Sequence, residues 1–184
     1  MNPVSISDKL SMEARLAHHR KMAESYYYAY SEKAVKDGAT YEEWKFSDEA
    51  LYWSPYFGDN VIELHKHPIS ITTAATMEAK AYSVILPDWA PLNFKCWPSD
   101  NGFAMQTHFG GHTKDGTLID FYAYGFVETN EKGYITRWET HVSPEYNNFL
   151  DVTIGVHGPF KNGPEPYMEA LTCKLKEAGV NLPV

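Results

Sequence analysis

The stretch from Thr117 to Val142 constrains the fold most, because it holds two long apolar runs joined by a short polar turn. The runs TLIDFYAYGFVET and YITRWETHV flank the residues NEKG at positions 130–133, and glycine supplies the positive φ that a tight reversal needs. The pattern therefore predicts a β-hairpin. Its long strands need cover on their apolar faces, which the rest of the chain must provide.

The first strand of this hairpin is apolar on both faces, and the faces differ in chemistry because side chains alternate along a strand. The even face combines a carboxylate and two phenols with apolar surface, which is typical of a small-molecule pocket. The small and branched odd face suits packing against a helix or another subunit. The alternative is that Asp120 marks an exposed strand start and that the tyrosines are core residues. The even positions hold Leu118, Asp120, Tyr122, Tyr124 and Phe126, and the odd positions hold Ile119, Phe121, Ala123, Gly125 and Val127.

Composition bounds the kind of partner. A length of 184 residues predicts one domain over residues 1–184, with a C-terminal helical extension from about residue 150 onward. The formal net charge of −8, without a cluster of lysine and arginine, argues against nucleic acid as a partner. Aromatic residues make up 15% of the chain, which favours a planar or aromatic ligand.

Cysteine spacing and hydropathy predict the compartment. Cys96 and Cys173 lie far apart without a metal-binding spacing, which indicates a reducing environment and no zinc site. No window approaches the roughly 20 apolar residues of a membrane span, and the N-terminus has no apolar core before its charges. We therefore expect a cytoplasmic protein that binds no membrane.

Two helices are predicted in the first quarter of the chain. The first spans about residues 7–37, with Gly38 as its stop and an apolar stripe that recurs every three to four residues. Tyrosines at positions 26–28 place one or two phenols on its inner face, which makes Tyr27 a candidate site residue. A second, short helix is expected at residues 40–47, before a short strand.

A third helix is predicted from about residue 70 to Leu86, ended by Pro87. Glu78 and Tyr82 lie four residues apart on its core-facing side. A carboxyl beside a tyrosine on such a face is a candidate proton carrier with a raised pKa. The alternative is that Glu78 pairs with Lys80 or faces solvent at the helix edge.

The pair His65 and His67 resembles a metal-ligand pattern, because alternate residues of a strand point to the same side. A metal site of that kind would need further ligands within an all-β chain, and this chain begins with a long helix instead. We therefore prefer either one histidine facing the core in a hydrogen bond or both lying at a pocket rim, and we expect no metal.

From residue 92 onward, turn residues divide the chain into four strands of an antiparallel meander that ends with the hairpin. His108 shares a face of the second strand with Gln106 and is a candidate for proton transfer, because imidazole titrates near neutrality. In the last strand Arg137, Glu139 and His141 share a face, as an outer charged ladder or a catalytic cluster. Beyond them, residues 145–163 are expected to form a turn-rich cover and residues 164–178 a final helix.

The order of helices and strands resembles the nuclear transport factor 2-like (NTF2-like) cone, an α+β barrel with N-terminal helices packed on a curved antiparallel sheet. The residues are most similar to its SnoaL-like group, which includes polyketide cyclases and phenazine-biosynthesis proteins. The resemblance covers about residues 10–149. It is carried by LPDW at positions 86–89, NFK at 93–95, the aromatic strand at 121–127 and GYITRWE at 133–139.

The resemblance implies a deep apolar pocket between the concave side of the sheet and the first and third helices. It also implies chemistry without metal or cofactor, carried by a His/Asp or Asp/Tyr pair, and a homo-oligomer (dimer or trimer) formed through the outer face of the sheet. Glu78 stands where phenazine-related proteins have a polar pocket residue, and Glu139, Thr140 or His141 where relatives have a carboxylate. Some sphingomonad relatives release formaldehyde from lignin-derived diaryl diols.

These expectations combine into a lyase that acts on a hydrophobic, hydroxylated aromatic metabolite by acid/base chemistry, as in dehydration or deformylation. A polyketide-type cyclase or isomerase is the alternative within enzymes, and a binding module for an aromatic intermediate is the alternative outside them. The candidate catalytic residues are His108, Asp120, His141, Glu78 and Tyr27, and the candidate substrate-binding residues are Tyr82, Trp89, Tyr122, Tyr124, Gln106 and Phe126.

Overall fold

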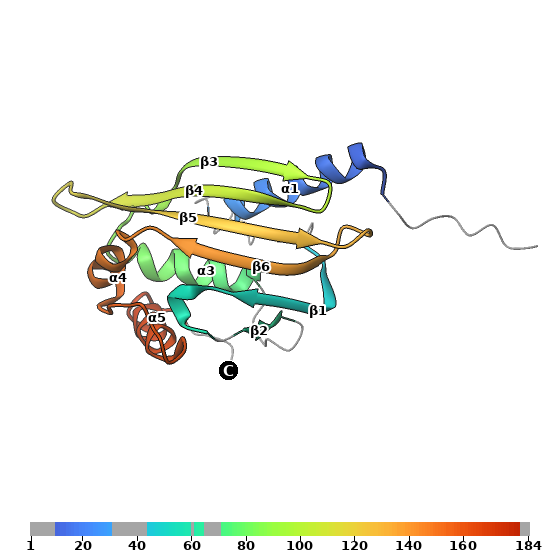
Figure 1. Ribbon diagram of the computed structural model, residues 1–184. Helices are drawn as coiled ribbons and strands as arrows, with labels where there is room; N and C mark the ends of the chain where they lie inside the picture. Colours follow the sequence, from blue (N-terminus) through green and yellow to red (C-terminus); the bar gives the residue numbers. More distant parts are fainter. Residues whose placement is uncertain (1–9, 31–43, 60, 65–70, 181–184) are drawn as a thin grey trace, which may run out of the picture.

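The protein folds as a curved six-stranded sheet with helices against one face (Figure 1). The computed structural model describes residues 10–30, 44–59, 61–64 and 71–180, with the backbone alone at 71–73. The strand order is β2-β1-β6-β5-β4-β3. The elements are α1 (Met12–Ala29), β1 (Phe46–Trp53), the short 3-10 helix η1 (Pro55–Phe57), β2 (Ile62–Glu63), α3 (Ile71–Tyr82), β3 (Ala90–Ser99), β4 (Gly102–His112), β5 (Leu118–Thr129), β6 (Ile135–Val142), α4 (Tyr146–Ile154) and α5 (Glu165–Glu177).

The predicted α+β class and the four-stranded meander are confirmed. Strands β3 to β6 pair in chain order and antiparallel, and Gly133 in the β5–β6 turn has a φ of 78°. On the side away from β5, β6 pairs with β1 in parallel, and Tyr52 lies opposite Trp138. The sheet is therefore mixed and open, and the two edge strands β2 and β3 do not close it into a barrel.

The helix boundaries differ from prediction where local capping decides them. Helix α1 begins at Met12, because the Ser11 hydroxyl accepts a hydrogen bond from the Ala14 N–H at 3.2 Å and caps the first turn. The expected cap at residues 7–8 and the expected continuation to residue 37 lie outside the described residues. The expected helix at residues 40–47 is wrong at its end, since β1 begins at Phe46.

The segment after β6 contains a helix where turns were expected. Helix α4 follows Pro144, and its inner stripe of Tyr146, Phe149 and Leu150 packs against the sheet end. The predicted C-terminal helix is confirmed as α5, which packs on α3 and contributes Leu171 and Leu175 to the core. Within the described residues, no helix is both long and apolar enough to cross a lipid bilayer.

The helices cover the odd face of β5, as predicted, but the cavity also borders this face, which corrects the expected pocket on the even face. Phe121, Ala123 and Val127 are buried beneath α1, α3 and α4, whereas Tyr122 and Phe126 are exposed on the outer face. Strand parity separates the two sets but does not show which set borders the cavity. The space left by the small inner side chains is where the cavity described below lies.

A buried histidine fastens α1 to the sheet. His19 is fully buried, with Nδ1 donating to the Ser99 carbonyl at 2.7 Å and Nε2 accepting from the Thr129 hydroxyl at 2.8 Å. Burial lowers the pKa of His19, although the hydrogen bond to Ser99 opposes the shift. The neutral ring is therefore the form that the native packing holds.

We expect this histidine to make stability fall as the pH falls. Its folded-state pKa lies below the unfolded value of about 6.5, so the unfolded chain binds the extra proton first. The stabilisation is complete above the unfolded pKa and is lost as the pH falls toward the folded pKa. Urea unfolding between pH 7.5 and pH 5 should show a smaller pH-dependent loss for His19→Gln than for the wild type. Equal slopes would show that His19 has no such role.

Candidate active site

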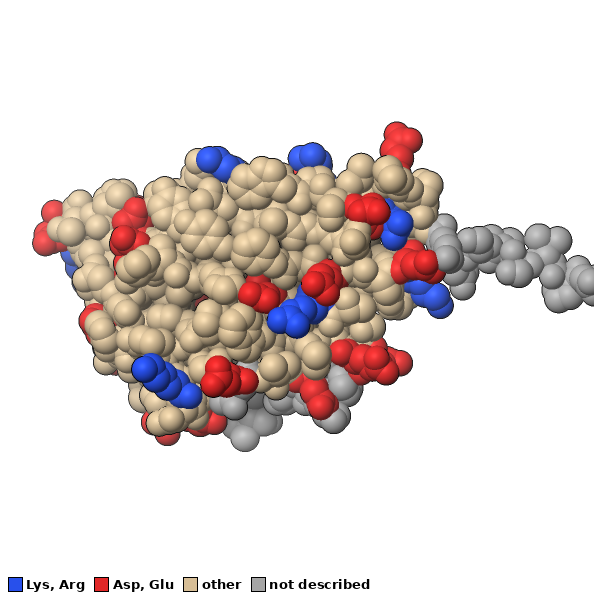
Figure 2. Space-filling view, viewed as in Figure 1, with Lys and Arg blue, Asp and Glu red and all other residues tan. Residues whose placement is uncertain are grey.

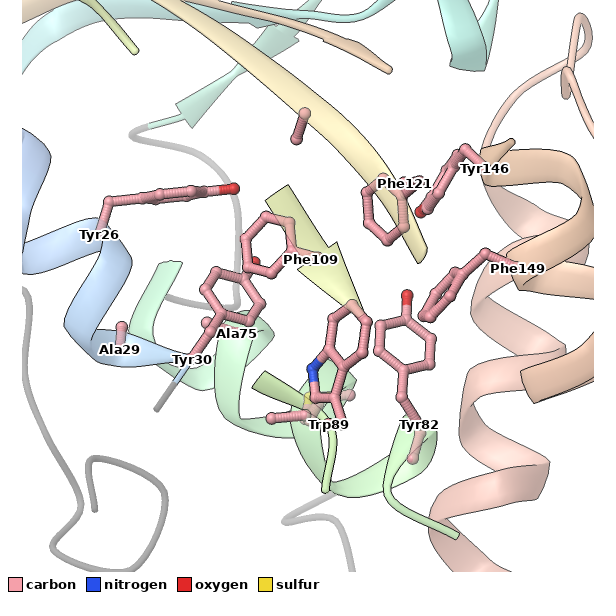
Figure 3. Packing of buried hydrophobic residues seen from close by; sticks show 14 of the residues in the cluster. Tyr26, Ala29, Tyr30, Ala75, Tyr82, Trp89, Phe109, Phe121, Tyr146 and Phe149 are labelled. Carbon is pink, nitrogen blue, oxygen red and sulfur yellow. The ribbon is translucent and has the colours of Figure 1, made fainter. Parts of the chain in front are cut away.

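A cavity of about 220 Å³ lies between the concave face of the sheet and the helices. Aromatic rings from α1, α3, α4 and the sheet converge on it, as Figure 3 shows for Tyr26, Tyr82, Phe121 and Tyr146. Its walls are mostly apolar, which suits a flat organic ligand. The lining residues are Tyr26, Tyr30, Tyr52, Ser54, Tyr56, Phe57, Ile62, Leu64, Ala74, Glu78, Tyr82, Trp89, Phe109, Phe121, Ala123, Trp138, Thr140, Val142 and Tyr146.

Among the described residues that line the cavity, Glu78 of α3 is the one with a carboxyl group. Tyr30, the C-cap residue of α1, donates a hydrogen bond to Glu78 Oε2 at 2.8 Å, and Tyr167 of α5 donates to Oε1 at 2.5 Å. Burial raises the pKa of Glu78, and the two tyrosine hydrogen bonds oppose the shift. A carboxyl group with a raised pKa changes its protonation state closer to neutral pH than an exposed glutamate does. A residue that carries a proton during a reaction needs this property.

Tyrosine hydroxyls extend this hydrogen-bond network along the cavity. The hydroxyls of Tyr82 and Tyr167 are 2.8 Å apart, and because Tyr167 donates to Glu78, Tyr82 donates to Tyr167. Tyr146 lines the same cavity as Tyr82. Burial raises the pKa of each of these three phenols well above its usual value. They therefore stay protonated and act as hydrogen-bond donors around the carboxyl group.

The structure brings together three of the residues predicted for the site. Glu78, Tyr82 and Trp89 all line the cavity, and the four-residue spacing of Glu78 and Tyr82 puts them on one side of α3 as predicted. The alternative that Glu78 pairs with Lys80 is not observed, since the hydrogen-bond partners of Glu78 are tyrosines. Trp89 stacks on Phe109 with ring centroids 5.5 Å apart and forms part of the cavity wall.

The other predicted site residues lie elsewhere. His108, Gln106, Asp120, Tyr122, Tyr124, Phe126 and His141 occupy the outer face of the sheet, away from the helices. Figure 2 shows this side, with a broad area of uncharged groups and a charged group over β6. Tyr27 does not line the cavity, and its ring packs on that of Phe94 with centroids 5.4 Å apart. A cavity role for these eight is therefore corrected, because strand or helix parity turns them away from it.

On the outer face the histidines pair with neighbouring carboxylates. His108 Nε2 lies 2.6 Å from Asp120 Oδ2, and His141 Nε2 lies 2.6 Å from Glu139 Oε1. Arg137 joins the second pair through Glu139 Oε2 at 3.2 Å. Of the two alternatives for the last strand, the charged outer ladder is the one observed.

Several cavity residues were not predicted as site residues. Tyr30 was expected only as part of a buried stripe, while Tyr167 and Tyr146 come from α5 and α4, which lie far from α3 in sequence. Tyr167 begins the buried stripe of α5, and this periodicity is the one sequence signal that could have indicated it. Its contact with a carboxyl group 89 residues away depends on how α5 docks against α3.

The described residues contain no group of three or more His, Cys, Asp or Glu side chains placed to hold a metal ion. His65 and His67 lie outside the described residues, so their predicted position at the core or a pocket rim stays a prediction.

No protein-family model matches the sequence, and no curated protein matches it. Solved structures do match in fold. An NTF2-like protein of unknown function from Cytophaga hutchinsonii is 12% identical, with a TM-score of 0.48 over 70% of this chain and 99% of that one. A Jannaschia protein described provisionally as a SnoaL-like polyketide cyclase is 7% identical, with a TM-score of 0.48 over 78% and 96% of the two chains.

A third structure, a phenazine biosynthesis-related protein from Pseudomonas aeruginosa, is 12% identical, with a TM-score of 0.38 over 94% of each chain. All three TM-scores lie below 0.5 and all three identities are 12% or less, so these likenesses carry no conclusion about the chemistry of this chain. The chemistry must be argued from the residues of this chain.

Proposed function

We propose that the cavity is the active site of a cofactor-independent lyase that transfers protons through Glu78 on a small aromatic substrate. The observation that carries the proposal is one carboxyl group with a raised pKa, held by two tyrosine hydroxyls in an otherwise apolar cavity. Such a group combines the two properties of a general acid/base, a tuned pKa and a fixed position.

In a dehydration, the Glu78 carboxylate removes a proton from the carbon next to a carbonyl group, and an enolate forms. The carbon–oxygen bond at the next carbon then breaks, and the departing hydroxyl takes the proton from Glu78 and leaves as water. In a deformylation, Glu78 takes the proton of that hydroxyl instead, the carbon–carbon bond breaks, and formaldehyde leaves. Glu78 then returns the proton to the enolate carbon. In both reactions the carboxyl group ends in its starting state.

The neighbouring phenols supply hydrogen bonds to the enolate oxygen. Tyr52 borders the cavity, and burial raises its pKa to about 12, so its hydroxyl remains a donor at neutral pH. Donors fixed in an apolar cavity stabilise developing charge more than donors in water do. If Glu78 returned the proton to a different carbon, the same site would act as an isomerase. An experiment must therefore distinguish a lyase from an isomerase.

Cavity size favours a one-ring substrate. A cavity of roughly 150 Å³ holds benzene, so about 220 Å³ accommodates a ring with a short functional side chain. Pockets for larger, drug-sized ligands span roughly 300–1,000 Å³. A diaryl diol with two separate rings would extend beyond the cavity, and we therefore propose a single-ring ketone or alcohol as the reacting part.

The probe 3-hydroxy-1-phenylpropan-1-one tests the three reactions together. Dehydration gives phenyl vinyl ketone and water, deformylation gives acetophenone and formaldehyde, and proton abstraction alone gives deuterium at carbon 2 when the solvent is D₂O. We expect at least one of these rates to exceed the uncatalysed rate, as followed by NMR. Binding of the probe with none of the three products would overturn the proposal and favour the binding-module alternative.

A further inference from the structure

A second, separate depression lies on the outer face of the sheet. It encloses about 210 Å³ and, unlike the inner cavity, its lining is mainly polar. Strand register assembles it, because Lys95 of β3 lies opposite Gln106 of β4, which lies opposite Tyr124 of β5. The next row is Asn93, His108 and Tyr122 in the same order. The depression and the inner cavity therefore lie on opposite faces of one sheet.

Two neighbours hold the imidazole of His108 in this depression. Nε2 of His108 lies 2.6 Å from Asp120 Oδ2, and the Tyr122 ring stacks on the imidazole with centroids 4.4 Å apart and planes 8° from parallel. Within the described part of the chain, Nδ1 of His108 has no hydrogen-bond partner. A ring fixed on one side with its second nitrogen open is arranged to meet a ligand.

The remaining polar groups of the depression are also uncommitted. Among the described residues, the Lys95 ammonium, the Gln106 amide and the Tyr124 hydroxyl form no hydrogen bond or ion pair with one another or with other residues. The nearby carboxylates are paired with histidines, Asp120 with His108 and Glu139 with His141. Within the residues that the structure describes, Lys95 is therefore a cation without a counter-ion, in the same depression as the exposed ring of Tyr122 and the partly buried ring of Tyr124.

We propose that this outer depression binds a small aromatic carboxylate. Lys95 and the Gln106 amide donate to the carboxylate, and the ring of the ligand lies against the tyrosine rings of β5. Figure 2 shows basic groups along the β3 edge of this face and mostly uncharged groups between that edge and the charged group over β6, a distribution that suits a flat ligand with one anionic end. The site is independent of Glu78 and of the reaction proposed above.

Benzoate and its uncharged counterpart benzamide, titrated into ¹⁵N-labelled protein, test the proposal. We expect benzoate to shift amide signals of β3 to β5 and to bind roughly tenfold more weakly to Lys95→Met, because a charge-assisted hydrogen bond is lost. Lys114→Met, which removes the same charge from the exposed β4–β5 turn, serves as the matched control and keeps wild-type affinity. Glu78→Gln should also bind benzoate normally, which separates this site from the inner cavity.

Three results would overturn the proposal. Equal benzoate affinity in Lys95→Met and the wild type would remove the role of the cation. Benzamide binding as tightly as benzoate would show that the carboxylate is not recognised. Absence of benzoate binding, together with a change of sedimentation coefficient in Lys95→Met, would identify the face as a contact between copies of the chain.

Discussion

Replacing Glu78 with glutamine should lower the turnover of the reacting probe by roughly 10²- to 10⁴-fold, the usual contribution of a general acid/base. Glutamine keeps the size of the side chain and can still bond Tyr30 and Tyr167, but it cannot carry a proton. Probe affinity should change little, because the cavity walls are untouched. The measurement is steady-state kinetics beside a direct binding titration.

Glu169→Gln is the matched control, because Glu169 is an exposed carboxylate on α5 and the substitution changes the net charge equally. This control should retain wild-type turnover. Wild-type kcat/KM should rise with pH through the raised pKa of Glu78, since the carboxylate is the proton-accepting form. A Glu78→Gln enzyme that keeps wild-type turnover and this pH dependence would exclude Glu78 as the proton carrier.

The Glu78→Gln variant should also show that the buried carboxylate of Glu78 lowers the stability of the folded protein. Its folded-state pKa lies above the unfolded value, so its contribution is most favourable below the unfolded pKa and is lost as the pH rises through the folded pKa. Glu78→Gln should therefore gain stability relative to the wild type as the pH is raised. Denaturant unfolding at acidic and neutral pH measures this difference and also confirms that the inactive variant is folded.

Phe149→Ala should destabilise the protein by about 3–5 kcal/mol, the range for deleting a buried phenylalanine ring. Phe149 of α4 is completely buried and packs on Tyr82, Trp89 and Phe121 with ring centroids 4.7 Å from each. Its removal leaves a void beside three aromatic rings that cannot collapse without moving the sheet or α3. Thermal unfolding should show a fall in Tm on the order of 10 °C.

Phe126→Ala removes an equal volume from the outer face of the same sheet, where Phe126 is 49% exposed. Its cost should stay below about 1 kcal/mol, because little buried surface is lost. Equal losses from the two variants would mean that the outer face is covered as thoroughly as the core, as by a second copy of the chain. The predicted homo-oligomer would then gain support from a stability measurement.

Local signals in the sequence predicted most of the elements. Turn glycines and alternating apolar residues specified the meander, and the three- to four-residue apolar spacing specified α1, α3 and α5. They also placed Glu78 and Tyr82 on one helical side, because that relation depends only on the helical repeat. These features involve neighbours within a few residues, so the chain itself determines them.

The sequence by itself thus determined the α+β elements, the hairpin at the centre of the sheet and the two chemically distinct faces of β5. Only the tertiary structure decided which face borders the cavity, and the result places His108, Asp120 and Tyr122 outside it. It also joined Glu78 to Tyr30 and Tyr167, from helices distant in sequence. The physical reason is that strand parity is symmetric between two faces, and the docking of helices breaks that symmetry through packing of the whole core.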